Sequence, residues 1–437
     1  MVPKADEDTR LATLRDWLTR LGEAIDADLS VRLWNGEVVP LGRTVTSDLV
    51  LAINTPDAVR RGILEPRLMT LVELNVEGLI EIEGGTPLDL VRAADYMRAN
   101  RHLRSISKVE LAKALWPFVS RRVESDATVA GTSYMKRVRA LFGKGRDDAD
   151  MVQHHYDVSN EFYRLLLGPE MVYSPGYYAD RETDLATAER EKLATVCRKL
   201  RLKPGHRLLD IGCGWGSLAI TAARDFGAIV HGVTLSKEQF ALACERVREA
   251  GLEDRITLEL KDYRDIPAEG QFDAVCQVGM SEHLGLDNHD AFFQRVHDLL
   301  KPRGMYFHEA AQRPGLRDLK KYRTPTAFRD IITRFIFPGG ELDFLGFATT
   351  GMEAHRLEVH DVENIREHYQ RSLELWTQNL YENREAAGEA AGWPRVRLWL
   401  LYLSLFAVGF DRGVCTCFQI VASRRHTGPG PLPMARG

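Results

Sequence analysis

The sequence predicts an α/β protein whose larger part is a parallel sheet covered by helices on both faces, preceded by a smaller α+β region. From Pro204 onward, short apolar strands alternate with helical stretches, which is the pattern of a parallel sheet. A glycine-rich turn follows the first of these strands, as it does where such sheets bind a ligand. The chain has 437 residues, more than one hydrophobic core usually contains, so we expect two domains.

The first part of the chain mixes helical and strand patterns. A helical start precedes three short segments that read as strands ended by glycine or proline, "VRLWNGEVVPLG", "DLVLAINTP" and "LIEIEGG". The stretches "PLDLVRAADYM" and "SKVELAKALWPFVSR" read as helices. These elements predict a smaller domain over residues 1–125.

A basic segment follows, and we assign residues 126–150 to a linker. Within it, "TSYMKRVRALFGKGR", residues 132–146, carries five basic residues and no acidic one, with apolar side chains between them. Two interpretations stay open: a solvated linker helix, or a basic amphipathic element that touches an anionic membrane surface.

The second domain is predicted over residues 151–425, and a flexible Pro/Gly-rich tail over residues 426–437. Its strands are expected in the order "HRLLDIG", "AIVHGVTLS", "ITLELKDY", "FDAVCQVGMS" and "GMYFHEAAQ". Its helices are expected at "SLAITAARDF", "KEQFALACERVREA" and "HDAFFQRVHDLL". This order gives a doubly covered, Rossmann-like sheet.

Composition excludes several classes of protein. The 58 basic and 62 acidic residues give a net charge of -4, so no global basic field would attract nucleic acid. The charged N-terminus is unlike a signal peptide, and no apolar run is long enough for a membrane span, so we expect a cytoplasmic protein. The six cysteines form no CxxC pair and no zinc spacing, so we read them as reduced core residues and expect no metal.

The glycine-rich turn "LLDIGCGWGSLAI" places Asp210 at the end of a strand, before Gly212, Gly214 and Gly216. Glycines suit a backbone that turns sharply and is approached closely by a ligand. The GxGxG spacing differs from the GxGxxG of dinucleotide folds, and an acid before the glycines suits an amino-acid ammonium better than a pyrophosphate. The turn therefore favours S-adenosylmethionine over NAD. The alternative is a tight turn without a ligand.

Polar residues follow the next two strands. "GVTLSKEQF" lacks the acid that often binds a ribose, so Thr234, Leu235 and Gln239 are the candidate donor contacts there. After the third strand, "KDYRDI" offers Asp262 and Tyr263 to the edge and face of an adenine. Because parallel strands end at the same edge of a sheet, these residues are expected to share one pocket.

These turns, together with "QHHYDVSNEFYRLLLGPEMVYSPGYY", "VGMSEHLG", "FIFPGGELDFLG" and "ENIREHYQRSLELW", closely resemble the cyclopropane-fatty-acid synthase family, including mycolic acid cyclopropane synthases and related lipid methyltransferases. The resemblance covers residues 150–425. "NTPDAVRRGI" and "EGLIEIEGG" resemble more loosely the accessory domain of longer bacterial members, where it is thought to help handle phospholipid. The implied fold is a class I S-adenosylmethionine methyltransferase with a smaller N-terminal α+β accessory domain.

The resemblance assigns a role to the segment "MVYSPGYY". It would close over the methyl donor as a lid, with Tyr173 and Ser174 at positions that contact the donor. For Tyr177 and Tyr178, packing under a loop and contact with a cationic intermediate remain alternatives.

The resemblance also implies a bound bicarbonate as the base. In the family it is held by a lid cysteine, a glutamate, a histidine, a backbone group on a strand and a tyrosine. Three of these side chains match Glu282, His308 and Tyr369, and the backbone group would belong to Ala310. Pro175 stands in place of the lid cysteine, and Phe406 replaces a second cysteine of mycolate-modifying relatives. An anion would still find donors in a histidine and a tyrosine.

The expected reaction is transfer of a methyl(ene) group from S-adenosylmethionine to the cis double bond of an unsaturated phospholipid acyl chain, through a carbocation, giving a cyclopropane. One alternative keeps donor and substrate but yields a methylene- or methyl-branched chain, and another is a degenerate lipid-binding protein. The expected partners are the phospholipid and the inner face of the membrane, bound peripherally, and the resemblance leaves room for a homodimer.

Overall fold

The computed structural model describes residues 4–65, 67–93, 116, 118, 159–324, 326, 329, 333, 340–428 and 430–433. The basic stretch 132–146 and the predicted linker 126–150 lie outside these residues. The chain divides into two compact units, one of residues 1–144, 326–331 and 380–405, and the other of residues 145–325, 332–379 and 406–437. The domain boundaries drawn from the sequence stay a prediction.

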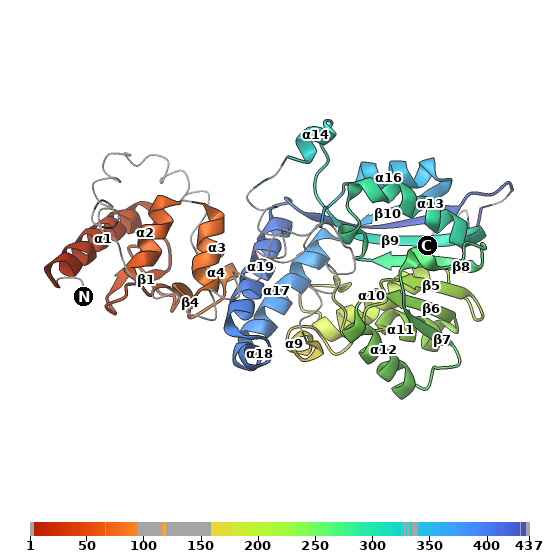
Figure 1. Cartoon of the computed structure of the whole chain (residues 1–437), viewed down its shortest axis with the longest axis horizontal. Helices are drawn as coiled ribbons and strands as arrows, with labels where there is room; N and C mark the ends of the chain where they lie inside the picture. The colour runs from red at the N-terminus through yellow and green to blue at the C-terminus, as the bar shows by residue number, and fades with distance from the viewer. Residues whose placement is uncertain are drawn as a thin grey trace. The chain divides into compact units, whose positions relative to one another are not determined.

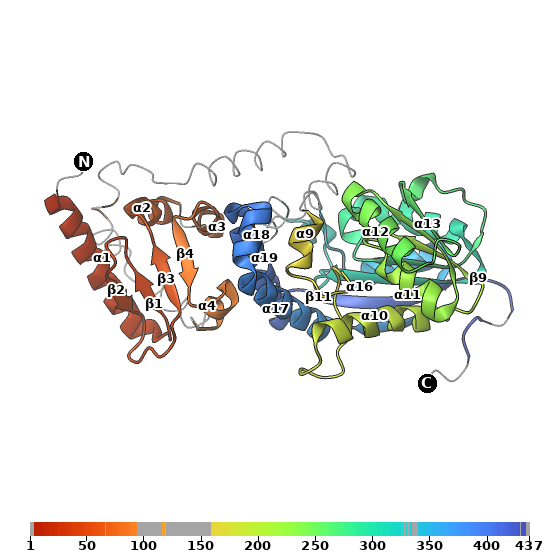
Figure 2. The same ribbon diagram turned by 90° about the horizontal axis from the view of Figure 1, so that it is seen from below.

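The first unit contains a small mixed sheet with the strand order β2-β1-β3-β4. The strands are β1 (Ser30–Arg32), β2 (Val38–Pro40), β3 (Val50–Ile53) and β4 (Ile80–Glu83), and β1 and β3 run parallel. The helices are α1 (Lys4–Ile25), α2 (Pro56–Leu64), α3 (Leu68–Val76), α4 (Pro87–Ala93) and α18 (Arg384–Ala391). In Figure 2, α1 lies beside β2, and its Leu14 and Leu18 pack on Val31 and Val39.

The second unit is built on a seven-stranded sheet with the order β10-β11-β9-β8-β5-β6-β7. Its strands are β5 (Arg207–Ile211), β6 (Ile229–Thr234), β7 (Ile256–Leu260), β8 (Phe272–Val278), β9 (Leu300–Gln312), β10 (Leu357–Asn364) and β11 (Thr416–Arg424). The five consecutive strands β5 to β9 pair in parallel. These are the five strands that the sequence predicts, and that prediction is confirmed.

Helices cover both faces of this sheet (Figure 1). One face packs on α10 (Leu185–Lys199), α11 (Ser217–Phe226) and α12 (Lys237–Glu249). The other packs on α13 (His289–Leu299) and α16 (Leu345–Ala354). The helices α9 (Asn160–Arg164) and α14 (Leu319–Tyr322) and most of α17 (Arg366–Glu382) also belong to this unit. The helix α19 (Trp393–Asp411) is divided, with residues 393–405 in the first unit and residues 406–411 in the second. The two faces thus have separate apolar cores, joined by the buried strands.

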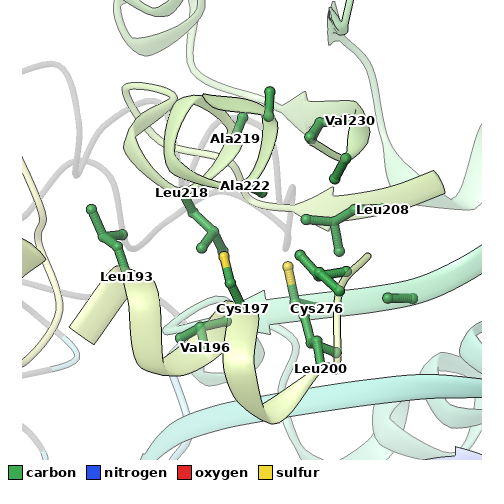
Figure 3. Packing of buried hydrophobic residues seen from close by; sticks show 14 of the residues in the cluster. Leu193, Val196, Cys197, Leu200, Leu208, Leu218, Ala219, Ala222, Val230 and Cys276 are labelled. Atoms are coloured by element: carbon green, nitrogen blue, oxygen red, sulfur yellow. The ribbon is translucent and has the colours of Figure 1, made fainter. Parts of the chain in front are cut away.

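The core under α10 and α11 fixes the position of the glycine-rich turn. Figure 3 shows Leu193 and Cys197 of α10 facing Leu218 of α11, with Leu208 of β5 to one side of them. All four residues are at most 7% exposed. Because interiors are close-packed, the start of α11 and the end of β5 are held together rigidly. The turn between them is therefore a stable place for a ligand.

Two features differ from the sequence expectation. β10 and β11 extend the sheet in the antiparallel sense, and β11 pairs with β9, whereas only a parallel sheet was predicted. Cys244, expected in the core, is exposed on the outer face of α12, while the other five cysteines are buried and free. In the part of the chain that the structure describes, no helix has the length and apolar character needed to cross a bilayer.

Candidate active site

The glycine-rich turn between β5 and α11 has a left-handed backbone. Gly212 and Gly214 have φ values of +80° and +54°, a region that side chains with a Cβ enter at a cost. A Cβ built on Gly212 would meet the side chain of Met280 at 3.2 Å. A Cβ on Gly214 would find no atom of the described chain within 4 Å. Gly212 is thus needed for packing, and the space beside Gly214 is open to a ligand.

A pocket opens at the ends of β5, β6, β7 and β8. It is lined by ten of the residues predicted to bind the donor: Tyr173, Ser174, Asp210, Gly212, Gly214, Thr234, Leu235, Gln239, Asp262 and Tyr263. Gly216 is the N-cap of α11 and does not border the pocket that the described residues form. The structure therefore brings the candidate donor residues together. Five further residues line the pocket, and no motif in the sequence marks them as pocket residues: Lys192, Trp215, Lys261, Arg264 and His283.

Asp210 supplies a buried carboxylate at the pocket wall. Its Oδ1 accepts a weak hydrogen bond from the Cys276 thiol at 3.4 Å. Its Oδ2 is buried without a hydrogen-bond partner among the described residues. Burial raises the pKa of Asp210 to about 6, because an ionised carboxylate in an apolar surrounding is costly. A ligand ammonium would satisfy both the unpaired oxygen and the charge.

The turn after β6 presents oriented polar groups. The Thr234 hydroxyl donates to Gln239 Oε1 at 3.1 Å and accepts from the backbone N–H of Ser236 at 3.2 Å. Ser236 in turn caps α12 by accepting from the backbone N–H of Gln239. The amide nitrogen of Gln239 is thereby directed away from Thr234. It is a donor suited to a ribose hydroxyl.

The turn after β7 is less free than expected. Asp262 caps a short 3-10 turn, and Arg264 binds both of its carboxylate oxygens, at 2.9 and 2.6 Å. Partial burial opposes ionisation, but Arg264 outweighs it and lowers the pKa of Asp262. Tyr263 packs edge-on against Phe292 at 5.3 Å. Asp262 thus meets a ligand as a carboxylate already engaged by an arginine.

The segment "MVYSPGYY" is held by hydrogen bonds at its C-terminal end. The Tyr177 hydroxyl donates to Glu363 at 2.6 Å. The backbone N–H of Tyr178 donates to His368 Nδ1 at 3.0 Å, and its hydroxyl lies 2.9 Å from the Ser372 hydroxyl. These contacts favour packing under a loop for Tyr177 and Tyr178 over contact with a cationic intermediate.

Tyr173 belongs to a series of aromatic rings that begins at the pocket. Its ring lies 5.5 Å from those of both Tyr163 and Trp376. Tyr163 contacts Trp215 of the glycine-rich turn at 4.8 Å, and Trp376 contacts Tyr369 at 6.2 Å. The series therefore connects a pocket residue with the predicted site residue Tyr369 of α17.

Tyr369 continues this series into α19. Its ring lies 4.5 Å from Phe410, which lies 6.4 Å from Phe406, the residue that replaces a family cysteine. Trp376 is fully buried, and its indole N–H has no hydrogen-bond partner in the described segments. Aromatic faces attract positive charge. Of the rings in this series, Tyr173 and Trp215 border the donor pocket that the described residues form, so a cation formed in that pocket would lie beside aromatic faces.

Glu282 lies in the short 3-10 turn after β8. Its Oε1 accepts from the backbone N–H of Ala311 at 2.8 Å, next to the predicted Ala310. Its Oε2 is buried without a partner among the residues described. Burial raises the pKa of Glu282 to about 7. A carboxyl with such a pKa can both accept and release a proton near neutral pH.

His308 on β9 is fully buried, and its protonation can be assigned from its neighbours. The backbone N–H groups of Met280 and Ser281 donate to Gln277 Oε1, at 3.0 and 3.2 Å. The amide nitrogen of Gln277 must then donate to His308 Nδ1, at 2.8 Å, and the Tyr306 hydroxyl lies 2.9 Å from the same nitrogen.

Nδ1 is therefore an acceptor, and the proton of the neutral imidazole is on Nε2. Burial lowers the pKa of His308 to about 3, so the ring stays neutral. Nε2 is buried and unpartnered within the described chain. His308 thus offers one free N–H to an anion or a carbonyl. Gln277 gave no signal in the sequence, since it is one polar residue in an apolar strand.

The described residues fit an S-adenosylmethionine donor. The open space at Gly214 accommodates a ligand against the backbone, Asp210 has a free oxygen for an ammonium, and Gln239 is oriented by Thr234. The donor, when bound, supplies an electrophilic methyl group on a sulfonium.

Comparison with known proteins agrees with this geometry. The family model described as mycolic acid cyclopropane synthetase matches residues 144–420. The chain is 33% identical over 415 residues to a probable fatty acid methyltransferase of Pseudomonas putida, covering 95% of this chain and 96% of that protein. A probable fatty acid methyltransferase of Mycobacterium tuberculosis is 32% identical over 385 residues, with 86% and 87% covered.

Solved structures show the same fold. The cyclopropane synthase MmaA2 of Mycobacterium tuberculosis superposes with a TM-score of 0.59 at 28% identity, over 63% of this chain and 98% of that one. The mycolic acid cyclopropane synthase CmaA1, solved with SAH and CTAB, gives 0.59 at 28% identity, over 64% and 99%. The predicted class I methyltransferase fold is confirmed. The chain therefore belongs to the mycolic acid cyclopropane synthetase family and is an S-adenosylmethionine-dependent methyltransferase that modifies lipids.

Proposed function

We propose that the enzyme transfers a methylene group to the cis double bond of an unsaturated phospholipid acyl chain and so forms a cyclopropane. The observation that carries this proposal is the series of aromatic rings that runs from Trp215 through Tyr163, Tyr173 and Trp376 to Tyr369. A double bond is a weak nucleophile, and its methylation leaves a carbocation that water would quench. Aromatic walls exclude water and tolerate that charge.

The reaction has two steps. The π electrons of the double bond attack the sulfonium methyl group, and the carbon–sulfur bond breaks with its electron pair going to sulfur. The resulting carbocation then loses a proton from the new methyl group while the ring closes. This chain must therefore hold the acyl chain in line with the donor, exclude water and supply a base.

Glu282, His308 and Tyr369 are the proposed base site. Glu282 has a free buried oxygen and a pKa near 7, and His308 has a free buried N–H. A tyrosine hydroxyl such as that of Tyr369 is a donor as well as an acceptor. His308 would donate to a bicarbonate and Glu282 would accept from its hydroxyl, so an anion bound by these groups would supply a base. Pro175 contributes no N–H to such an anion.

A second candidate is formation of a methylene- or methyl-branched chain by the same first step. Two observations favour considering it. Pro175 stands where the family carries a lid cysteine, which changes the surroundings of the base. The second observation is a relative that is named as a methyltransferase, the sphingolipid C9-methyltransferase 2 of Gibberella zeae. It is 35% identical over 278 residues, which span 62% of this chain and 53% of that protein.

The substrate and the location are part of the same proposal. The phospholipid would be reached from the cytoplasmic face of the membrane, with the enzyme bound peripherally. The basic stretch 132–146 would contribute by attraction to anionic lipids, on the order of 1 kcal/mol for each basic residue close to the surface. A homodimer would bring two such stretches to one membrane.

The deciding experiment is expression in a host that lacks these lipids, with a donor whose methyl group carries three deuterium atoms. Mass analysis of the fatty acids is expected to show two retained deuterium atoms in a product that resists mild hydrogenation, which is a ring. Uptake of hydrogen by a product with two deuterium atoms would indicate a methylene branch. Three retained deuterium atoms would indicate a methyl branch. Unmodified fatty acids, from a folded enzyme that binds the donor, would refute the substrate class.

A further inference from the structure

A buried lysine lies in the wall of the donor pocket. Lys192 of α10 is 2% exposed at its side chain and lines the pocket together with Ser174 and Asp210. Its ammonium donates to the Ser174 hydroxyl at 2.5 Å and lies 3.8 Å from Glu309 Oε1. A buried ammonium is costly unless its protons and its charge are satisfied. The groups around Lys192 therefore show whether its charge and its N–H donors are satisfied within the protein or are available to a ligand.

The protein satisfies this ammonium incompletely. Glu309 neutralises its charge from a distance too long for a hydrogen bond, and Glu309 Oε1 has no hydrogen-bond partner among the described residues. The other oxygen of Glu309 accepts from Gln419 at 2.8 Å. A lysine carries three N–H donors, and Ser174 takes one. Lys192 thus keeps hydrogen-bonding capacity for an anion in the pocket.

Lys199, on the same helix, provides a contrast. Its ammonium donates to Gln419 at 2.7 Å and to Glu363, so both its charge and its donors are used within the protein. Lys199 therefore makes direct contact with its carboxylate. The ammonium of Lys192 instead donates its short hydrogen bond to the hydroxyl of the lid residue Ser174.

The opposite charge is present in the same pocket. Asp210 has a buried oxygen without a partner in the described chain. Burial raises the pKa of Asp210, and the hydrogen bond from Cys276 and the positive charge of Lys192 partly oppose this rise. The pocket thus offers one ammonium and one carboxylate. A ligand head that carries both charges, such as an α-amino acid, matches this pair. The donor of this enzyme ends in such a group.

We propose that Lys192 binds the carboxylate of the donor's amino-acid group while Asp210 binds its ammonium. The two contacts fix which end of the donor enters first and place the sulfonium at a set distance from the wall. Ser174 and Glu309 hold the lysine in position. This inference rests on the donor assignment made above and deepens it by naming the residue that recognises the carboxylate.

The test compares two ligands that differ only in that carboxylate: S-adenosylmethionine and decarboxylated S-adenosylmethionine. Their dissociation constants are measured by titration calorimetry with the full-length protein. We expect the wild type to prefer the carboxylated ligand roughly 10- to 100-fold, the size of a hydrogen bond to a charged group. The double variant Lys192→Met, Glu309→Gln removes the ammonium without leaving a buried carboxylate alone. It is expected to lose most of this preference.

Controls separate recognition from packing. Lys199→Met removes a second lysine from the same helix and is expected to keep the wild-type ratio of the two affinities. If the double variant fails to fold, Lys192→Gln gives the same comparison, because glutamine retains a donor for Ser174 but no charge.

Two outcomes would overturn the inference. An unchanged ratio in a folded Lys192 variant would mean that the lysine serves Glu309 and Ser174 only. An equal loss of affinity for both ligands would mean that it shapes the pocket without recognising the carboxylate. A wild type that binds neither ligand would instead refute the donor assignment itself, which makes the two failures distinguishable.

Discussion

Asp343 makes the stability of the second unit depend on pH. The side chain is 3% exposed, and its Oδ2 lies 3.6 Å from His289 Nε2. Neither atom has a hydrogen-bond partner among the described residues. Burial, and after it the charge of Glu282, raises the pKa of Asp343 from 3.8 to about 8. The carboxyl is therefore protonated in the folded protein at neutral pH.

The sign of the effect follows from this pKa. A carboxyl that binds its proton more tightly in the folded state contributes stability below its unfolded pKa, and that contribution is lost as pH rises through the folded pKa. With values of 3.8 and about 8, the loss between pH 5 and pH 9 is about 4 kcal/mol, of which about 1.4 kcal/mol falls above pH 7.

Neighbouring groups modify this result in known directions. Burial raises the pKa of Glu282 to about 7, which adds a loss of the same sign. Burial lowers the pKa of His289 below 6.5, against a smaller opposing effect of Glu341, so His289 acts in the opposite direction at lower pH. The range above pH 7 therefore isolates the carboxyls best.

The perturbation is Asp343→Asn, which keeps the shape of the side chain but cannot ionise. Urea unfolding followed at pH 7, 8 and 9 is expected to show a free energy of unfolding that falls with pH in the wild type and falls by about 1 kcal/mol less in the variant. Asp290→Asn on α13, whose carboxylate is 83% exposed, is the control and should keep the wild-type slope. Equal slopes in wild type and Asp343→Asn would refute the reasoning.

Four further predictions concern the site. Gly214→Ala should lower the free energy of unfolding by about 1 kcal/mol, because of the positive φ, and should weaken donor binding in calorimetry at least tenfold; unchanged affinity would mean that the donor does not approach this turn. Donor affinity should increase with pH up to about pH 6 and then level off, since Asp210 must be ionised to hold an ammonium; a flat profile from pH 5 to 8 would contradict this. Tyr177→Phe should speed hydrogen exchange of residues 171–178, because its bond to a carboxylate contributes about 1.5 to 3 kcal/mol; unchanged exchange would rule out the anchor. Glu282→Gln and His308→Ala should lose most turnover while binding the donor within a fewfold of wild type, and retained turnover would remove them from the base site.

The donor pocket could be predicted from the sequence because its residues follow the strands in a regular way. Asp210, Thr234 and Asp262 each lie at or just after the end of one of three successive parallel strands. Parallel strands end at the same edge of the sheet, so the alternation of strands and helices suffices to bring these residues into one pocket. No knowledge of distant contacts is needed for that step.

Residues whose roles depend on contacts between segments far apart in the sequence could not be predicted. Lys192 lies in "LATAEREKLATVCRK" among other charged residues and reads as part of a solvated helix face. Its ammonium lies 3.8 Å from Glu309 of β9, which accepts a hydrogen bond from Gln419 of β11. These two strands pair over a large sequence separation. Asp343 and His289 likewise come together from separate segments. The periodicity of a sequence predicts local structure, but it does not predict which distant residues come into contact.

The proline in "MVYSPGYY" can be understood from the contacts on either side of it. Ser174 is held by Lys192, and the backbone N–H of Gly176 donates to the Ser372 hydroxyl at 2.9 Å. A Cβ on Gly176 would meet Ala188 Cβ at 2.8 Å, so the chain passes close to α10 at this point. Between two such attachments, Pro175 has a fixed φ and needs no hydrogen-bond acceptor for its nitrogen. The position of the lid therefore does not depend on a side chain at residue 175, and a cysteine there would add a thiol without moving Ser174. Any difference in product between Pro175 and a Pro175→Cys variant would then report on the base site rather than on closure of the lid.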